Sequence, residues 1–207
     1  MYYFIKTPWI LKKYYNGCIW SIPTDKKIIY LTFDDGPHAL ATPFILGTLK
    51  NYQARATFFC IGKNVIEEPE LYRKILEDGH RVGNHTHNHL NGWKTPDKLY
   101  FQNISEAAKY IDSDLFRPPY GRISRFQMKH LLAEPFRYRI VMWNILSADF
   151  DQGITGNQCA FHVIGNAGPG SIVIFHDSAK AYDRMRVALP KVLKYFSDKG
   201  YSFESIR

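Results

Sequence analysis

The stretch IIYLTFDDGPHALATPFILGTLK, residues 28–50, passes from one kind of secondary structure to another. Its first six residues are β-branched, aromatic or apolar, which predicts a short buried strand over Ile28 to Phe33. The four residues DDGP follow as a turn, and Thr42 before Pro43 predicts the N-cap and first position of a helix. The stretch therefore predicts a strand, a turn and a helix in succession.

The same alternation continues along the rest of the chain. Helical spacing of apolar residues marks Pro69 to Asp78 and Ala181 to Lys199, and Thr95 before Pro96 predicts another helix start. Strand candidates are Ile28 to Phe33, Ala56 to Ile61, Arg81 to Asn84, Leu115 to Arg117, Tyr138 to Trp143, Ser171 to Phe175 and Tyr201 to Ile206. Alternation of this kind predicts an α/β fold with a parallel sheet, and about seven strands favour a barrel over an open sheet. In such a barrel the carboxyl ends of the strands carry the site.

The composition is typical of one globular domain. The chain has 207 residues, of which 45% are apolar and 22% charged, and a formal net charge of +8. Lys and Arg are scattered without a basic block, so the charge indicates a solvated basic surface, and we expect no nucleic-acid partner.

The N-terminal residues contain apolar patches, but Lys6, Pro8, Lys12 and Lys13 interrupt them. No uninterrupted apolar core of signal-peptide length forms, and no stretch approaches the roughly 20 apolar residues that span a bilayer. We therefore expect a cytoplasmic protein.

The three cysteines, Cys18, Cys60 and Cys159, include no CxxC pair. They indicate neither a disulfide framework nor a thiolate zinc site. Cys60 lies in the apolar run ATFFCIG and is expected to be a small buried side chain.

Two adjacent carboxylates, Asp34 and Asp35, follow directly on the first predicted strand. Two adjacent ionised carboxylates repel each other, which is energetically unfavourable unless a cation lies beside them. A plain turn in which one Asp caps the following loop is about equally favoured by these residues alone.

Three imidazoles follow the strand that ends at Asn84. His85 and His89 are four residues apart, a spacing that brings two side chains to one side of a helical turn, and His87 would face elsewhere. A polar surface tract would also explain three histidines. With a carboxylate from another strand end, however, His85 and His89 supply the two-His, one-carboxylate set that leaves positions open for water and substrate.

The loop Arg117-Pro118-Pro119-Tyr120-Gly121 follows a further strand. Its two prolines fix the backbone and leave the amide of Tyr120 in a stiff loop, as an oxyanion site requires. Taken alone, this loop fits a structural turn with a surface Arg better.

Two more strand ends carry ionisable groups. The run from Trp143 leads to Asp149, and the apolar run IVIF leads to His176. A histidine at the end of a buried strand is more often structural than catalytic, but five such constellations after five strands favour a shared site.

These five segments, TFDDGP, HTHNH, RPPYG, the stretch from Trp143 to Asp149, and IVIFHD, resemble in their order the polysaccharide deacetylase family. This family is also called carbohydrate esterase family 4 or the NodB-homology domain. The match runs from about Thr32 to Asp177, with matching flanks to the C-terminus. It implies a distorted (β/α) barrel over residues 28–207, with residues 1–27 as an extension packed on the barrel.

The resemblance implies roles for single residues. Asp35, His85 and His89 would bind a divalent metal, with zinc expected and cobalt, nickel or iron as alternatives. Asp34 would be the general base, and Arg117 would hold it in place and ionised.

The remaining implied roles concern the leaving group and the oxyanion. His176 would be the general acid, with its pKa raised by Asp149, and the amide of Tyr120 would help to bind the oxyanion. Further residues expected to contact the substrate are Pro118, Pro119, Tyr120, Phe150 and Ile174. Two positions depart from the family pattern: Leu146 stands where Asp is frequent, and Phe150 where Trp is frequent. They put the shape of the acetyl pocket and sugar subsites in doubt.

The implied function is hydrolysis of N-acetyl groups on amino sugars of the chitooligosaccharide or peptidoglycan type, by a monomer. One alternative is a deacylase or deformylase of a lipid-linked amino sugar at the inner membrane face. It rests on the apolar, basic segment that contains Tyr2, Tyr3, Phe4, Trp9, Lys12, Lys13 and Tyr14; a leading helix packed over the barrel bottom explains that segment better. Another alternative, a non-catalytic carbohydrate-binding barrel, is disfavoured because no expected ligand, base or acid is missing.

Overall fold

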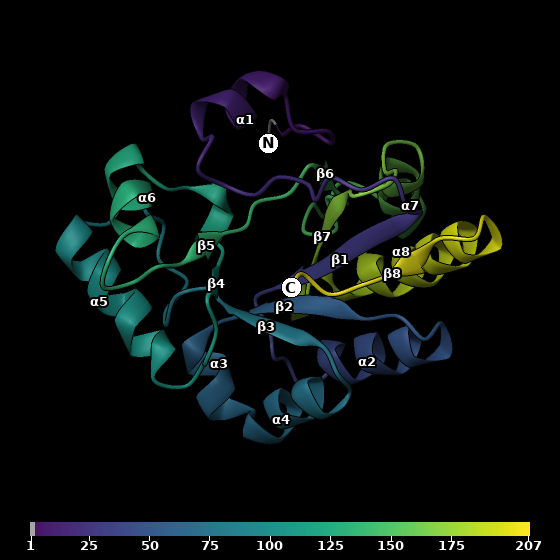
Figure 1. The fold of residues 1–207 in the computed structure, drawn as a ribbon. Coiled ribbons are helices and arrows are strands. Elements are labelled where there is room, and N and C mark those ends of the chain that lie inside the picture. The colour runs from purple at the N-terminus through teal and green to yellow at the C-terminus, as the bar shows by residue number, and fades with distance from the viewer. Residues whose placement is uncertain (1–2) are drawn as a thin grey trace.

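The strands of the computed structural model, which describes residues 3–207, form one curled parallel sheet (Figure 1). Seven strands follow the order β5-β4-β3-β2-β1-β7-β6, and β8 pairs with the beginning of β1. The strands are β1 (Ile28–Asp34), β2 (Ala56–Cys60), β3 (Arg81–Asn84), β4 (Leu115–Phe116), β5 (Arg139–Ile140), β6 (Ile145–Leu146), β7 (Ile172–His176) and β8 (Ser202–Phe203). The predicted α/β fold, with about seven parallel strands in a distorted barrel, is confirmed.

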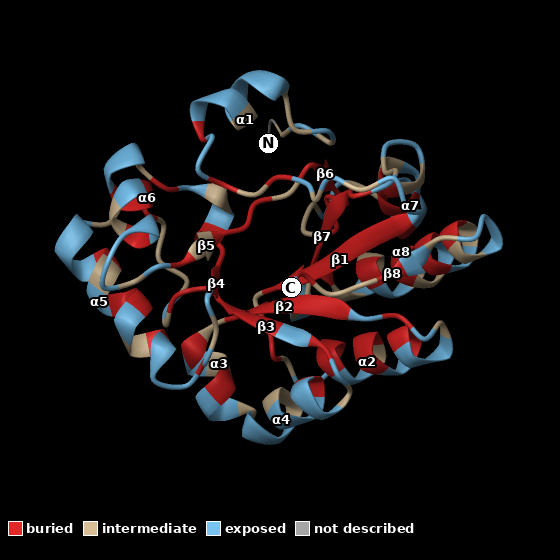
Figure 2. Ribbon diagram, in the orientation of Figure 1, coloured by how far each residue is buried: buried red, intermediate tan, exposed pale blue. Residues whose placement is uncertain are grey.

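Helices surround the sheet on its outer side, and Figure 2 shows their outward faces exposed around a buried sheet. They are α1 (Trp9–Tyr14), α2 (Ala41–Asn51), α3 (Gly62–Glu67), α4 (Pro69–Glu77), α5 (Asp97–Ala108), α6 (Arg125–Leu132), α7 (Gly156–Ile164) and α8 (Ala179–Asp198), with a 3-10 turn, η1, over Pro119–Gly121. The helices predicted over 69–78 and 181–199 are confirmed to within two residues at each end.

Alternation along β1 decides which side chains enter the barrel. Ile29, Leu31 and Phe33 pack outward in the core shared with the helices. Tyr30 packs in the barrel interior with side chains of other strands. Thr32 and Asp34 continue this inward series, so the last residue of the strand carries a carboxylate into the open end of the barrel.

Two helix starts differ from the sequence prediction. Thr42 lies inside α2, because its hydroxyl donates to Asp177 (2.6 Å) and accepts from the His38 amide (2.7 Å). The amide of Ala41 faces His38 Nδ1 at 3.3 Å in place of a threonine cap. Thr95 donates to the Asn91 carbonyl (2.8 Å), and α5 begins later, at Asp97.

The barrel is closed by a strand that is broken in the middle. Ile140 in β5 pairs with β4, whereas Ile145 in β6 pairs with β7, and only four residues separate the two. The strand predicted over Tyr138 to Trp143 is therefore shorter than expected, and β6 was missed. Between the two strands, the Met142 amide and the Asn144 carbonyl bond to the N-terminal segment instead of to a strand of the sheet.

The N-terminal segment, residues 3–27, runs along this break. Ile19 accepts from the Met142 amide and donates to the Ile140 carbonyl, both at 2.8 Å, and Ile5 accepts from the Leu146 amide at 2.9 Å. The segment thus lies along the wall of the barrel at the seam, and the six-residue helix α1 contributes no buried side chain. Tyr2, part of the expected membrane-facing set, lies outside the described residues. No helix of the described chain combines the length and hydropathy needed to cross a membrane.

Candidate active site

The ionisable residues singled out in the sequence meet at the carboxyl ends of the strands. Parallel pairing places Asp34 of β1 directly beside His176 of β7. Asn84, the last residue of β3, pairs with Phe116 of β4, so the segments that follow these two strands also start side by side. Because all these strands run in the same direction, their C-terminal residues share one end of the barrel.

Arg117 is fully buried and organises this end of the barrel. Its Nη1 donates to Asp34 Oδ1 and to Thr32 Oγ1, both at 2.7 Å. Its other nitrogens donate to the carbonyls of Val141 (3.0 Å) and Met142 (2.9 Å) in the broken strand. The surface Arg that this loop suggested by itself is therefore wrong: every guanidinium nitrogen has an acceptor, and one acceptor is the carboxylate of Asp34.

Asp35, His85 and His89 converge on a common point. Asp35 Oδ1 lies 3.1 Å from His89 Nε2 and 3.6 Å from His85 Nε2, and one ligand atom from each residue lies within 4.8 Å of the others. Burial alone would raise the pKa of Asp35, but the close imidazole of His89 and the charge of His176 hold that pKa below its ordinary value. Asp35 is therefore ionised at neutral pH.

The tautomer of His85 follows from the hydrogen-bond partner of its Nδ1. Nδ1 lies 2.7 Å from the carbonyl oxygen of Arg117, which only accepts, so Nδ1 carries the proton and Nε2 presents a lone pair. Burial lowers the pKa of His85 to about 4, which keeps the ring neutral. The lone pair of Nε2 thus faces Asp35 Oδ1, a buried oxygen without a hydrogen-bond partner in the described chain. A carboxylate and a neutral imidazole aimed at each other, with a second imidazole beside them, fit a divalent cation.

The segment that carries His85 and His89 is a loop, so the expected helical turn is wrong. Thr86 and His89 have positive φ values of 66° and 55°. The side-chain oxygen of Asn84 accepts the Thr86 amide (2.8 Å), and that of Asn103 in α5 accepts the His87 amide (2.9 Å). Side-chain acceptors thus shape the backbone, and the two imidazoles still come together, with ring centroids 5.1 Å apart.

A second pair of ionisable groups, His176 and Asp149, lies at the ends of β7 and β6. Asp149 Oδ1 lies 2.7 Å from His176 Nδ1, and Asp149 Oδ2 accepts the His176 amide at 2.8 Å. Burial alone would lower the pKa of His176, but the charge and hydrogen bond of Asp149 outweigh it and raise that pKa to about 9. His176 therefore carries a proton on each ring nitrogen at neutral pH.

Tyr120 lies at the rim in a left-handed conformation, with φ 60°. Its ring is 58% exposed, and its hydroxyl lies 3.1 Å from His89 Nδ1. Its amide donates to no acceptor within residues 3–207, whereas the next amide, that of Gly121, donates to the Pro118 carbonyl. A free amide in a stiff loop is available to a developing oxyanion.

The other residues expected at the substrate differ in accessibility. Pro118 and Pro119 are buried, although they belong to the same loop as the exposed Tyr120. Phe150 is partly exposed, and its ring packs edge-on against His176 at 5.3 Å. Ile174 is 1% exposed and packs with Leu146 and Ala148, so its expected contact with substrate stays a prediction.

Four residues that support the site were not singled out in the sequence. Thr32 accepts from Arg117, and Asn64 donates to the Asp35 carbonyl at 2.7 Å, which supports Asp35 at its φ of 78°. Arg184 of α8 donates to the Asp149 carbonyl at 2.6 Å. Burial raises the pKa of the fourth, Asp177, to about 8, although the Thr42 hydroxyl lowers it. Of these four residues only Asp177 could have been found from the sequence, because it follows His176 directly.

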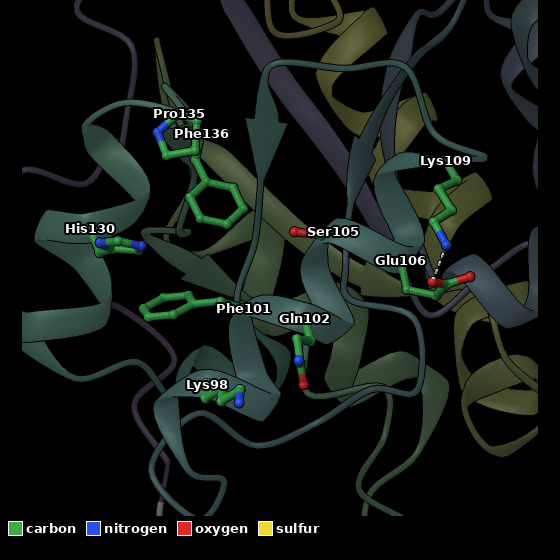
Figure 3. Close-up of a pocket in the computed structure, with 9 residues that line it drawn as sticks. All are labelled: Lys98, Phe101, Gln102, Ser105, Glu106, Lys109, His130, Pro135 and Phe136. Atoms are coloured by element: carbon green, nitrogen blue, oxygen red, sulfur yellow. Dashed lines mark hydrogen bonds and ion pairs between the residues drawn. The ribbon is translucent and has the colours of Figure 1, made fainter.

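A hollow of about 620 Å³ between α5 and α6 is a different kind of feature (Figure 3). Its walls carry the packed rings of Phe101, His130 and Phe136. Its one carboxylate, Glu106, is paired with Lys109 at 2.6 Å. Nothing there resembles the converging ligands at the strand ends, so the site lies at the barrel end.

Comparison with known proteins gives a family match. The family model described as polysaccharide deacetylase matches residues 21–134. A peptidoglycan-N-acetylglucosamine deacetylase of Bacillus cereus is 36% identical over 193 residues, which cover 90% of this chain and 90% of that protein. The peptidoglycan-N-acetylmuramic acid deacetylase PdaA of Bacillus subtilis is 32% identical over 196 residues, covering 88% of this chain and 71% of that protein.

A solved structure of a related enzyme has the same fold. The crystal structure of the Bc1960 peptidoglycan N-acetylglucosamine deacetylase superposes with a TM-score of 0.87 and 31% identity, covering 97% of this chain and 95% of that one.

Proposed function

Because the chain belongs to the polysaccharide deacetylase family and is similar to named peptidoglycan deacetylases, we propose that it removes acetyl groups from N-acetylated amino sugars with a bound divalent metal. The substrate class is an N-acetylhexosamine glycan of the chitooligosaccharide or peptidoglycan type, as the names of the related deacetylases suggest. The cytoplasmic location and monomeric state expected from the sequence stay predictions.

One observation carries this proposal: Asp35 and two imidazoles converge on one point, beside a second carboxylate that points the same way. Asp34 Oδ2 lies 3.8 Å from His85 Nε2, while its Oδ1 is held by Arg117. Two adjacent carboxylates in the sequence therefore have different environments. Asp35 has a free oxygen facing imidazoles, and Asp34 is fixed by a guanidinium with one oxygen left for a proton.

Asp35, His85 and His89 would hold the ion, which supplies polarisation of the substrate carbonyl and a lowered pKa for a bound water. Zinc is the expected ion, and cobalt, nickel or iron suit the same ligands. Asp34 takes the proton of the attacking water on Oδ2. Arg117 keeps Asp34 oriented for this step, because its guanidinium also anchors to two backbone carbonyls.

His176 delivers a proton to the departing amine. Asp149 fixes Nδ1–H, so the proton for transfer is on Nε2, the nitrogen directed away from Asp149. The amide of Tyr120 donates to the oxyanion that forms on the acyl carbon, and loss of one such donor typically costs about 100- to 1,000-fold in rate. The residues of this chain thus supply a base, an acid and an oxyanion donor around one acyl group.

An acetate-release assay tests the proposal. The purified protein is assayed on chito-oligomers and on peptidoglycan fragments, as isolated, after chelation, and after addition of zinc, cobalt, nickel or iron(II). Acetate release that stops on chelation and returns with metal supports the proposal. Release that is unaffected by complete metal removal, or its absence on every N-acetylated glycan with metal bound, would refute it.

A further inference from the structure

Three segments without an acidic residue meet beside the candidate site. Residues 1–24, 79–96 and 115–133 contain no Asp or Glu, although each contains Lys or Arg. The hydroxyl of Tyr15 (2.9 Å) and the indole nitrogen of Trp93 (2.8 Å) both donate to the carbonyl of Ile123. One carbonyl therefore joins all three segments, which bring basic side chains together from parts of the chain that supply no carboxylate of their own.

Trp93 and Arg122 form the centre of this surface. Trp93 is 54% exposed, and the Arg122 guanidinium lies 4.2 Å from its ring centroid. The hydrogen bond from the indole nitrogen fixes the ring, so the exposed aromatic surface is pre-organised. A large aromatic side chain that is fixed by a hydrogen bond and still more than half exposed indicates a binding surface.

The surface continues from the candidate site toward α1. On one side Tyr120, two residues before Arg122, contacts His89, with ring centroids 4.5 Å apart. On the other side the Arg125 guanidinium lies 5.2 Å from the ring of Tyr14, which is also exposed. Aromatic rings and basic groups thus alternate from the candidate metal ligand His89 outward.

Arg122 and Arg125 lack an acidic partner, unlike several other exposed arginines of the described chain. Arg81 pairs with Asp114, and Arg186 pairs with Asp183. Within the described residues no carboxylate lies within ion-pair distance of Arg122 or Arg125. A guanidinium free of carboxylates, beside a site for a glycan, is suited to bind a carboxylate of that glycan in a two-point contact.

We propose that Trp93, Arg122, Arg125 and Tyr14 form a binding surface for a carboxylate-bearing glycan chain that extends from the reacting sugar. The proposal rests on the proposed function and narrows its substrate class from N-acetylated glycans in general to anionic ones. The rings of Trp93 and Tyr14 pack against sugar faces, and the two guanidinium groups pair with carboxylates on the chain.

Charge complementarity and continuity with the candidate site favour a glycan over a lipid surface. Trp93 is held by its indole nitrogen and Tyr120 by its hydroxyl, so neither polar group is free to face lipid head groups. Trp93 follows β3, which leads to His85, and Tyr120 and Arg122 follow β4, which leads to Arg117, so the surface adjoins the candidate site.

Direct binding measurements test the proposal. By isothermal titration, with zinc-loaded protein, the wild type is expected to bind a tetrasaccharide muropeptide about tenfold more tightly than chitotetraose at low salt. High salt should reduce this preference. Arg122→Gln should abolish the preference, and Trp93→Ala should weaken the binding of both glycans. The matched control is Arg186→Gln on α8, because Arg186 also lies over a ring, that of Tyr182 at 5.9 Å. It should leave both affinities unchanged.

A comparison of the muropeptide with its peptide-free glycan shows whether the bound carboxylate belongs to the sugar or to the peptide stem. Preference that survives removal of the stem assigns the contact to the sugar-borne carboxylate, and preference that is lost assigns it to the stem. Equal wild-type affinity for acidic and neutral tetramers overturns the proposal. So does the combination of no binding to either glycan with sedimentation on phosphatidylglycerol vesicles that is lost in Arg122→Gln.

Acetate release reports separately on the proposed function. A preference for the acidic glycan without acetate release would support the binding surface and refute the proposed function. Acetate release without that preference would support the proposed function and refute the binding surface.

Discussion

His85, which is buried, and His176, which is partly buried, lie at one end of the same barrel, yet they have opposite protonation states. Burial alone would lower the pKa of both rings. Nδ1 of His85 faces a backbone carbonyl, and its pKa falls to about 4, whereas Nδ1 of His176 faces the Asp149 carboxylate, and its pKa rises to about 9. The group that faces Nδ1, a carbonyl oxygen or a carboxylate, is the main difference between the neutral ligand and the charged acid.

The two partners come from different parts of the fold. The carbonyl that faces His85 belongs to Arg117, whose side chain also fixes Asp34. The carboxylate that faces His176 lies beyond the broken strand, and Arg184 of α8 fixes its backbone. The comparison predicts that loss of the ligand His85 removes the metal, and that changes at the base Asp34 or on the His176 side alter proton transfer with the metal retained.

The largest effect is expected from His85→Ala. Loss of one of three ligands should abolish metal retention and lower acetate release by more than about 1,000-fold. Metal analysis by mass spectrometry, together with the acetate assay, measures both. The matched control is His87→Ala, because His87 lies between the two ligands in sequence and packs toward Tyr110. A His85→Ala protein that keeps stoichiometric metal contradicts the ligand assignment.

Asp34→Asn should act on the same side but leave the metal in place. Removal of the base should lower kcat by about 100- to 10,000-fold. The variant also leaves the buried Arg117 guanidinium without its counter-charge, so the free energy of unfolding should fall by about 3 kcal/mol. Activity, metal content and urea denaturation are measured together. Metal loss equal to that of His85→Ala would show that Asp34 and Asp35 do not have separate roles.

Asp149→Asn tests the His176 side through pH dependence. His176 is protonated below its pKa of about 9, so the wild-type rate should fall as pH rises through about 9. The raised pKa also stabilises the folded state, fully below about pH 6.5 and progressively less as pH rises to about 9. In the variant the alkaline limb should move toward lower pH, and the rate at pH 8 should fall about 100-fold. An unchanged limb in a kcat/KM profile would remove His176 as the acid.

Tyr3→Phe should have the smallest effect. The Tyr3 hydroxyl donates to Asp151 at 2.6 Å, and its ring packs against Phe150, which in turn packs on His176. The variant keeps the ring and loses one hydrogen bond, so the free energy of unfolding should fall by about 1 kcal/mol with the rate within about twofold. Thermal denaturation and the acetate assay measure these values. A tenfold loss of rate would mean that this N-terminal contact positions His176 more tightly than packing alone suggests.

Much of the fold could be predicted because its signals are local. The apolar runs of β1, β2 and β7 and the capping glycines after α4 and α8 act over a few residues. The break between β5 and β6 could not be predicted, since it depends on hydrogen bonds from residues more than 100 positions away in the sequence. The helix start expected at Thr42 was wrong for a similar reason: its hydroxyl serves Asp177, 135 residues later.

The sequence by itself determined which chemical groups stand at the strand ends and in what order, because strands, turns and residue types are local properties. Only the tertiary structure decided their states. It set the tautomer of His85 through the Arg117 carbonyl, the charge of His176 through Asp149, and the course of the N-terminal segment along the barrel seam. It also gathered three acid-free segments around Ile123. The physical reason is that proton positions and surface potential depend on which groups face each other across the fold, and distant parts of the chain supply those groups.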